Sequence, residues 1–144
     1  MTTPRRAVPP GMREQLDLGY VFGSVLTFAQ RPLVTELQQL VDWQPDVAVL
    51  GAPFDLGTTN RPGARFGPRA LRTQAYEPGT YHLDLGLEIF DWLEVVDVGD
   101  AYCPHGMVQE CLDNIKAKVA GVVEHGIVPV TIGGDHFVTG TAAT

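Results

Sequence analysis

Residues 108–136 read VQECLDNIKAKVAGVVEHGIVPVTIGGDH, and this stretch decides the fold class. Its first part has apolar residues at helical spacing and charged residues on the other faces. The apolar positions are Val108, Cys111, Leu112, Ile115, Val119, Val122 and Val123. His125-Gly126 is a typical C-terminal stop for such a helix. The apolar run 127–132 then predicts a strand ending at Gly133-Gly134, provided that Pro129 faces an unpaired side or a bulge.

Two more strands are predicted upstream, at 46–50 (DVAVL) and 93–98 (LEVVDV). Apolar runs without polar alternation are typical of sheets covered on both faces. Pro68 suits a first helical turn, so GPRALRTQAY predicts a helix between these two strands. Strands alternating with helices through short connections predict an α/β fold with a parallel sheet.

The domain organisation follows from the same pattern. Residues 1–45 are rich in proline and glycine, and we interpret them as an N-terminal extension with a short helix at Leu33–Val41. Residues 46–144 form the α/β domain. The chain reaches Thr144 soon after its third strand, which would leave that strand without cover, so we expect it to be incomplete, to borrow a partner or to be marginally stable.

The composition is that of an ordinary globular protein, with 144 residues, 44% apolar and 19% charged. Its 17 acidic and 10 scattered basic residues give a net charge of -7, which argues against nucleic-acid and anionic-membrane partners. No signal peptide or membrane-spanning segment is predicted. Cys103 and Cys111 fit no zinc or redox motif, and we expect a cytoplasmic protein.

Chemistry is expected beyond the C-terminal ends of the strands, where ligands of open α/β sheets bind. Gly133 and Gly134 allow unusual backbone angles there, so His136 could ligate a metal through a neutral imidazole or act as a base. A lone histidine after a strand is nevertheless more often a cap or a packing residue. Asp135 by itself fits a helix cap.

Loop 51–67, GAPFDLGTTNRPGARFG, is long for a compact domain and combines glycines with Asp55, Asn60, Arg61 and Arg65. Two interpretations have equal weight. The loop is either a stiff Ω-like segment whose arginines pair locally, or a segment that contacts substrate.

A third polar group lies at the end of the second strand. Asp97, Asp100 and His105 could form another metal set, but Asp97 is as readily a cap or a partner of Arg65 or Arg69, and Pro104-His105-Gly106 is typical of a turn. We do not assign these residues as ligands. Phosphate-loop and nucleophile motifs are lacking, since the only serine, Ser24, has no glycine elbow.

Two motifs together resemble the ureohydrolase (arginase/agmatinase) family, in particular its agmatinase branch. GAPFDLGTTNRPGARFGPRALR, residues 51–72, resembles the N-terminal motif of that branch, and VTIGGDHFVT, residues 130–139, resembles its Gly-Gly-Asp-His motif. Residues 84–106 and 127–130 are also similar. The resemblance extends from about Tyr20 onward, and the two motifs in this order are far more specific than either alone.

The resemblance implies an arginase-like, three-layer α-β-α fold and a pair of divalent ions, usually Mn²⁺ with Ni²⁺ possible. Such a pair activates a hydroxide that attacks a guanidinium carbon, releasing urea and an amine from an agmatine-like compound. His136 matches a metal ligand, and Asp135 matches a structural or supporting neighbour. Asn60 and Arg61 lie in a stretch that resembles the segment lining the substrate entrance in that family, and the family generally forms homo-oligomers.

The chain also departs from the family pattern. The remaining ligands lie in D-A-H-x-D and D-x-D motifs, which these 144 residues lack, and one imidazole does not retain two ions. Phe137 stands where many relatives have serine. We therefore expect the N-terminal portion of a longer or completed amidinohydrolase. The alternatives are a non-catalytic module that docks onto a complete subunit and a degenerate remnant.

Overall fold

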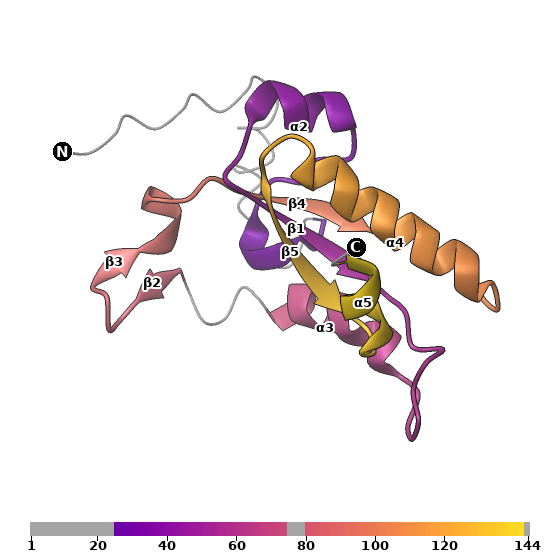
Figure 1. Cartoon of the computed structure of the whole chain (residues 1–144). Coiled ribbons are helices and arrows are strands. Elements are labelled where there is room, and N and C mark those ends of the chain that lie inside the picture. The colour runs from indigo at the N-terminus through magenta and orange to yellow at the C-terminus, as the bar shows by residue number, and fades with distance from the viewer. Residues whose placement is uncertain (1–24, 75–79, 143–144) are drawn as a thin grey trace.

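The computed structural model describes residues 25–74 and 80–142. Its central sheet has three parallel strands in the order β4-β1-β5, with bounds β1 Val47–Ala52, β4 Val95–Asp100 and β5 Val128–Gly133. The helices around this sheet are α2 Leu37–Trp43, α3 Gly67–Gln74, α4 Val108–Val123 and α5 Phe137–Ala142 (Figure 1). The predicted α/β class with a parallel sheet is confirmed.

Shorter elements connect these strands and helices. A small antiparallel hairpin pairs β2, Tyr81–His82, with β3, Leu87–Glu88, and projects from the body of the molecule (Figure 1). Three 3₁₀ turns lie at Phe28–Gln30, Ala64–Phe66 and Ile89–Asp91. Among the described residues, no helix has the length and apolar character needed to cross a membrane.

The alternation of side chains along β1 produces the layers. Ala48 and Leu50 point to one face, where they pack in a cluster with residues of α2 and α4. Val49 points to the opposite face and packs with Val95, Ile132 and the ring of Phe28. Because β1 has a neighbour on each side and apolar cover on both faces, its backbone and side chains are almost entirely buried.

The N-terminal segment pairs with the sheet, and this overturns part of one prediction. The helix expected at Leu33–Val41 begins only at Leu37, because residues 32–34 are extended along β4. The amide of Val34 donates to the carbonyl of Asp97 at 2.8 Å, and the amide of Asp97 donates to the carbonyl of Pro32 at 2.9 Å. The start of the apolar run 19–34 and the end of the helix predicted from Pro68 lie outside the described residues.

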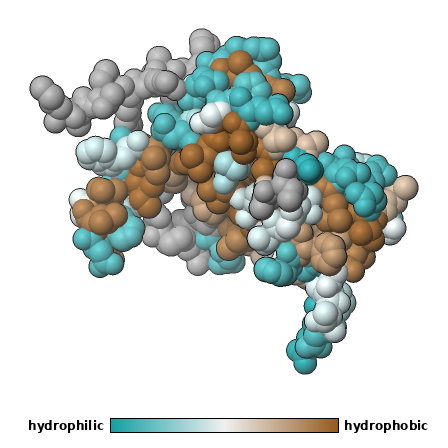
Figure 2. Space-filling model, viewed as in Figure 1, coloured by the Kyte–Doolittle hydropathy of each residue, from teal (hydrophilic) through white to brown (hydrophobic). Residues whose placement is uncertain are grey.

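Within residues 25–74 and 80–142, strand β5 pairs only with β1 and forms an open edge of the sheet. The amide of Val128 donates toward β1, to the carbonyl of Asp46 at 3.0 Å, so the next residue, Pro129, has its nitrogen on the open side. This arrangement meets the condition that the sequence set for a proline in this strand. Val128 is 58% exposed and Val130 is 42% exposed, and Figure 2 shows apolar side chains gathered over the start of β5.

Candidate functional site

His136 lies in the tight turn between β5 and α5, at the C-terminal edge of the sheet. Its side chain is exposed and lines a hollow of about 600 Å³ beside β5, together with Thr131 and residues of α4 and α5. Within the described part of the chain, its imidazole makes no hydrogen bond. The ring therefore keeps a nitrogen lone pair that can bind a cation, and it is not a packing residue in an apolar core.

The backbone before His136 is fixed by close contact with the end of β1. The amide of Asp135 donates to the carbonyl of Phe54 at 2.8 Å, and a Cβ on Gly134 would lie 2.8 Å from the carbonyl oxygen of Ala52 and collide with that of Phe54. Only glycine fits at position 134. The Asp135 carboxylate accepts a 2.9 Å hydrogen bond from the amide of Phe137, which is the helix cap expected from the sequence.

Loop 51–67 is held at its base, and its tip is exposed. Arg65 pairs with the buried carboxylate of Asp55 at 2.7 Å, and the amide of Gly63 donates to the same carboxylate at 2.7 Å. The hydrogen bond with Arg65 is the main reason why the pKa of Asp55 lies below its ordinary value. Asn60 and Arg61, the candidate substrate-binding residues, lie on the exposed outer part of the loop.

The two interpretations of the loop therefore describe different parts of it. The local pairing of an arginine applies to the base, through Arg65. Substrate contact stays a prediction for Asn60 and Arg61 at the tip, and the structure brings neither of them into hydrogen-bond contact with His136.

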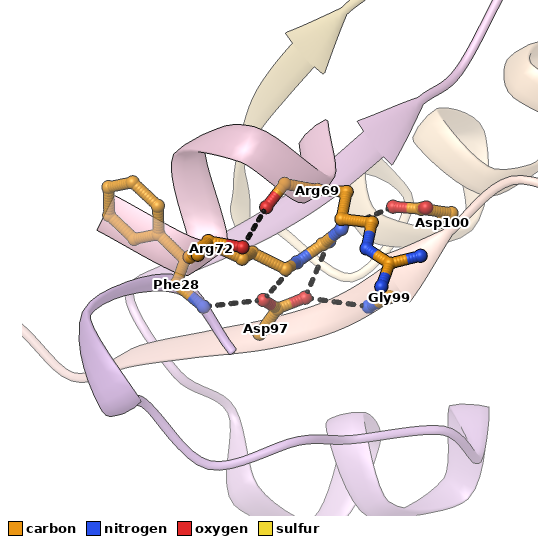
Figure 3. Close-up of polar contacts among 7 residues, drawn as sticks. Phe28, Arg69, Arg72, Asp97, Gly99 and Asp100 are labelled. Atoms are coloured by element: carbon orange, nitrogen blue, oxygen red, sulfur yellow. Dashed lines mark hydrogen bonds and ion pairs between the residues drawn. The ribbon is translucent and has the colours of Figure 1, made fainter. Parts of the chain in front are cut away.

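A buried ion cluster lies at the same edge, and the sequence assigned its arginine incorrectly. Asp97 is fully buried and pairs with Arg72 of α3, instead of Arg65 or Arg69 (Figure 3). Nε and Nη2 of Arg72 donate to Oδ2 and Oδ1 of Asp97 at 2.7 and 2.9 Å, and Nη1 donates to Asp100. Burial alone would lower the pKa of Arg72, but its hydrogen bonds to the two carboxylates outweigh burial and raise it.

The Asp97 carboxylate also holds backbone. It accepts 2.8 Å hydrogen bonds from the amides of Phe28 and Gly99, so it connects the N-terminal segment to the end of β4 (Figure 3). The sequence contained one signal that Arg72 is buried. This residue lies four positions after Pro68, so both are on the same side of α3, the side that faces the sheet. Both Asp97 and Asp100 pair with Arg72.

The residues present fit one ligand position and not a complete two-ion site. In residues 25–74 and 80–142, no group of three histidine, cysteine, aspartate or glutamate side chains is arranged to hold a metal ion. His105 is exposed. Cys103 packs near Cys111, and its pKa is raised to about 11, first by burial and then by Cys111, so this thiol is protonated at neutral pH. His136 offers an imidazole that lines a hollow.

Curated relatives match most of this chain. The guanidinobutyrase of Pseudomonas aeruginosa is 36% identical over 121 residues, which are 82% of this chain and 36% of the relative. The mitochondrial agmatinase of Gallus gallus is 40% identical over 94 residues, 65% of this chain and 28% of the relative. The chain thus spans about a third of the length of these relatives.

Solved structures match the same architecture. A hypothetical agmatinase from Burkholderia thailandensis has a TM-score of 0.74 and 30% identity, covering 85% of this chain and 38% of that protein. A Trypanosoma cruzi formiminoglutamase crystallised with Mn²⁺ has a TM-score of 0.60 and 27% identity, covering 68% of this chain and 34% of that protein. The three-layer, arginase-like fold is therefore present in partial form.

The sequence model of one protein family spans nearly the whole α/β domain. That model, described as the arginase family, matches residues 45–143, which include both motifs and all three strands of the central sheet. Together with the relatives, this match makes the chain a member of the arginase family.

Proposed function

We propose that this chain is the N-terminal portion of a metal-dependent amidinohydrolase that cleaves an agmatine-like guanidino compound into urea and an amine. The observation that carries the proposal is the position of His136, exposed at the C-terminal edge of a parallel sheet and facing a hollow beside an open strand. The guanidino hydrolases among its relatives support the substrate class. The proposal includes a cytoplasmic, homo-oligomeric enzyme without nucleic-acid or membrane partners.

The proposed reaction is a hydrolysis at the guanidinium carbon. A water oxygen bonds to that carbon, the bond from carbon to the alkyl nitrogen breaks, and the departing amine takes up a proton. A pair of divalent ions, Mn²⁺ or Ni²⁺, would lower the pKa of the water and offset the charge that develops. This chain would supply one imidazole ligand through His136, with the other ligands outside these 144 residues. Asn60 and Arg61 would border the substrate entrance.

Mutation of His136 in a completed enzyme tests this proposal. In a chimera, this chain replaces the matching third of the P. aeruginosa guanidinobutyrase, and Mn²⁺ content and urea release are measured. His136→Ala should reduce Mn²⁺ per subunit and lower turnover more than about 100-fold. Loss of a residue that only supports a metal ligand lowers metal affinity or activity by at most about 100-fold. His105→Ala, an exposed histidine at the same sheet edge, is the control and should retain both.

Two results would contradict the proposal. Unchanged Mn²⁺ content in the His136→Ala chimera would remove His136 from the ligands. Robust urea release by the 144-residue chain alone with added Mn²⁺ would contradict the account of missing ligands.

A second candidate function is a non-catalytic module that docks onto a complete ureohydrolase subunit. The exposed edge of β5, with Val128 and Val130 half exposed, favours it because an unpaired apolar strand is a site for strand addition. The downstream reading frame separates the two candidates. An in-frame continuation that encodes D-A-H-x-D favours the enzyme, and a stop codon favours the module or a degenerate remnant.

A further inference from the structure

The Asp135 carboxylate joins two segments that lie far apart in the sequence. Its Oδ2 accepts a hydrogen bond from the amide of Gly57 at 2.7 Å, across 78 positions of the chain. Its Oδ1 accepts from the amide of Phe137, at the start of α5, at 2.9 Å. The cap of α5 needs only one of these oxygens, so capping does not account for the bond to loop 51–67.

The loop and the turn that carries His136 lie in close contact around this carboxylate. A Cβ on Gly57 would lie 2.6 Å from the ring of Phe137 and 3.0 Å from Asp135 Oδ2. At the C-terminal end of the loop, a Cβ on Gly67 would lie 2.7 Å from the carbonyl oxygen of Gly133. Gly57 within the loop and Gly67 at its end therefore both lie directly against the glycine-glycine-aspartate-histidine turn, where packed atoms transmit a displacement.

We propose that Asp135 is a positioning residue that couples loop 51–67, with Asn60 and Arg61, to the imidazole of His136. The inference rests on the proposed function, because only then does the loop face substrate while His136 binds metal. The carboxylate fixes the position of the loop relative to the turn that carries His136. A change at the loop therefore reaches His136, and a change at His136 reaches the loop.

Variants of Asp135 that keep the cap separate coupling from capping. Asparagine and serine cap helices as well as aspartate does, so Asp135→Asn and Asp135→Ser retain an acceptor for the amide of Phe137. Asparagine replaces the second oxygen with an NH₂ group, which cannot accept from Gly57, and serine has only one oxygen. Two variants are used so that one is available if the other folds poorly.

Amide hydrogen exchange of the 144-residue chain, residue by residue, measures the link. In Asp135→Asn, exchange at the Gly57 amide should rise about tenfold, the loss expected for one hydrogen bond to a carboxylate, while the Phe137 amide stays protected. Unchanged Gly57 exchange in both Asp135 variants would overturn the inference.

A double-mutant cycle with Asp55 tests transmission. Asp55→Asn removes the charge that pairs with Arg65 and leaves one acceptor oxygen in place of two, so it loosens the hold on Gly63 and Arg65 without touching the carboxylate of Asp135. In the wild-type background, this change should also raise exchange at the Phe137 amide. In the Asp135→Asn background, that transmitted effect should disappear. An Asp55→Asn effect on Phe137 that is equal in both backgrounds, or lacking in the first, would leave Asp135 as a cap only.

These readouts need neither metal nor turnover, so they fail separately from the proposed function. If the unmutated chimera takes up no Mn²⁺, the proposed function falls, and with it the role of Asp135 toward a ligand. If the chimera does take up Mn²⁺ while the exchange effects are lacking, only the coupling is refuted.

Discussion

Removal of the Arg72 guanidinium should strongly destabilise the described part of the chain. In Arg72→Met, Asp97 keeps the amide donors of Phe28 and Gly99 but loses two charged donors and the positive charge that pairs with it. Two hydrogen bonds to a charged group are worth about 3 to 6 kcal/mol. This agrees with about 3 to 5 kcal/mol for breaking a buried ion pair. Asp100, whose side chain is 40% exposed, returns to water at little cost.

Urea denaturation followed by circular dichroism provides the measurement, with Arg69→Met as the matched control. Arg69 lies on the same helix but is exposed, so its replacement should change the free energy of unfolding by less than about 0.5 kcal/mol. A loss of about 3 to 5 kcal/mol is a large part of the 5 to 15 kcal/mol typical of a domain. Arg72→Met should therefore be largely unfolded at concentrations of urea that leave Arg69→Met intact.

Two further variants show whether charge or shape is responsible. Arg72→Lys retains a positive charge without the planar pair of donors, so its stability should fall between those of the wild type and Arg72→Met. Asp97→Asn combined with Arg72→Met removes the buried charge, so it should cost less than the sum of the single changes. If Arg72→Met lies within about 1 kcal/mol of Arg69→Met, the cluster is not the anchor described here.

Two other predictions concern the loop and the glycine turn. The lowered pKa of Asp55 means that its pair with Arg65 stabilises the native state above the ordinary aspartate range and loses this effect as pH falls below about 4. The gap in urea midpoint between wild type and Arg65→Gln should thus shrink between pH 7 and pH 3, and a constant gap would contradict the pairing. Gly134→Ala should destabilise the chain by about 1 to 3 kcal/mol through backbone overlap, whereas Gly121→Ala, in α4 with open space around it, should stabilise it by up to about 1 kcal/mol. Calorimetric melting temperatures that move in the same direction would refute this contrast.

The sequence predicts the fold best where local periodicity and burial agree. Helix α4 runs from Val108 to Val123, as predicted, because its apolar spacing and the stop at Gly126 are both local signals in the sequence. Leu33 shows the limit. Its apolar neighbours favour a helix, but pairing with Asp97 sixty-four positions later draws residues 32–34 into an extended conformation. The two-residue strands β2 and β3 are too short for any alternation to be detected.

The candidate site shows the same division between local and distant information. The position of His136 follows from a motif of four consecutive residues, so the sequence is sufficient to find it. The partner of Asp97 depends on how α3 packs on the sheet, and Arg65, Arg69 and Arg72 all lie close together in the sequence. The deciding signal was the side of α3 that faces the sheet, which carries Pro68 and Arg72. The second bond of Asp135 had no local signal, because Gly57 lies 78 positions away.

Under the proposed function, these contacts hold the turn of the first ligand in place before any metal binds. The turn that presents His136 is fixed by the carbonyls of Ala52 and Phe54, by the Gly57 amide and by the cap of α5, all within this chain. A ligand whose backbone is already held in place loses less conformational entropy when a cation arrives, so on this proposal only the side chain of His136 would still have to be ordered. The open edge of β5 lies beside the same hollow. A strand added there would therefore cover Val128 and Val130 and, through its C-terminal end, bring new side chains toward His136.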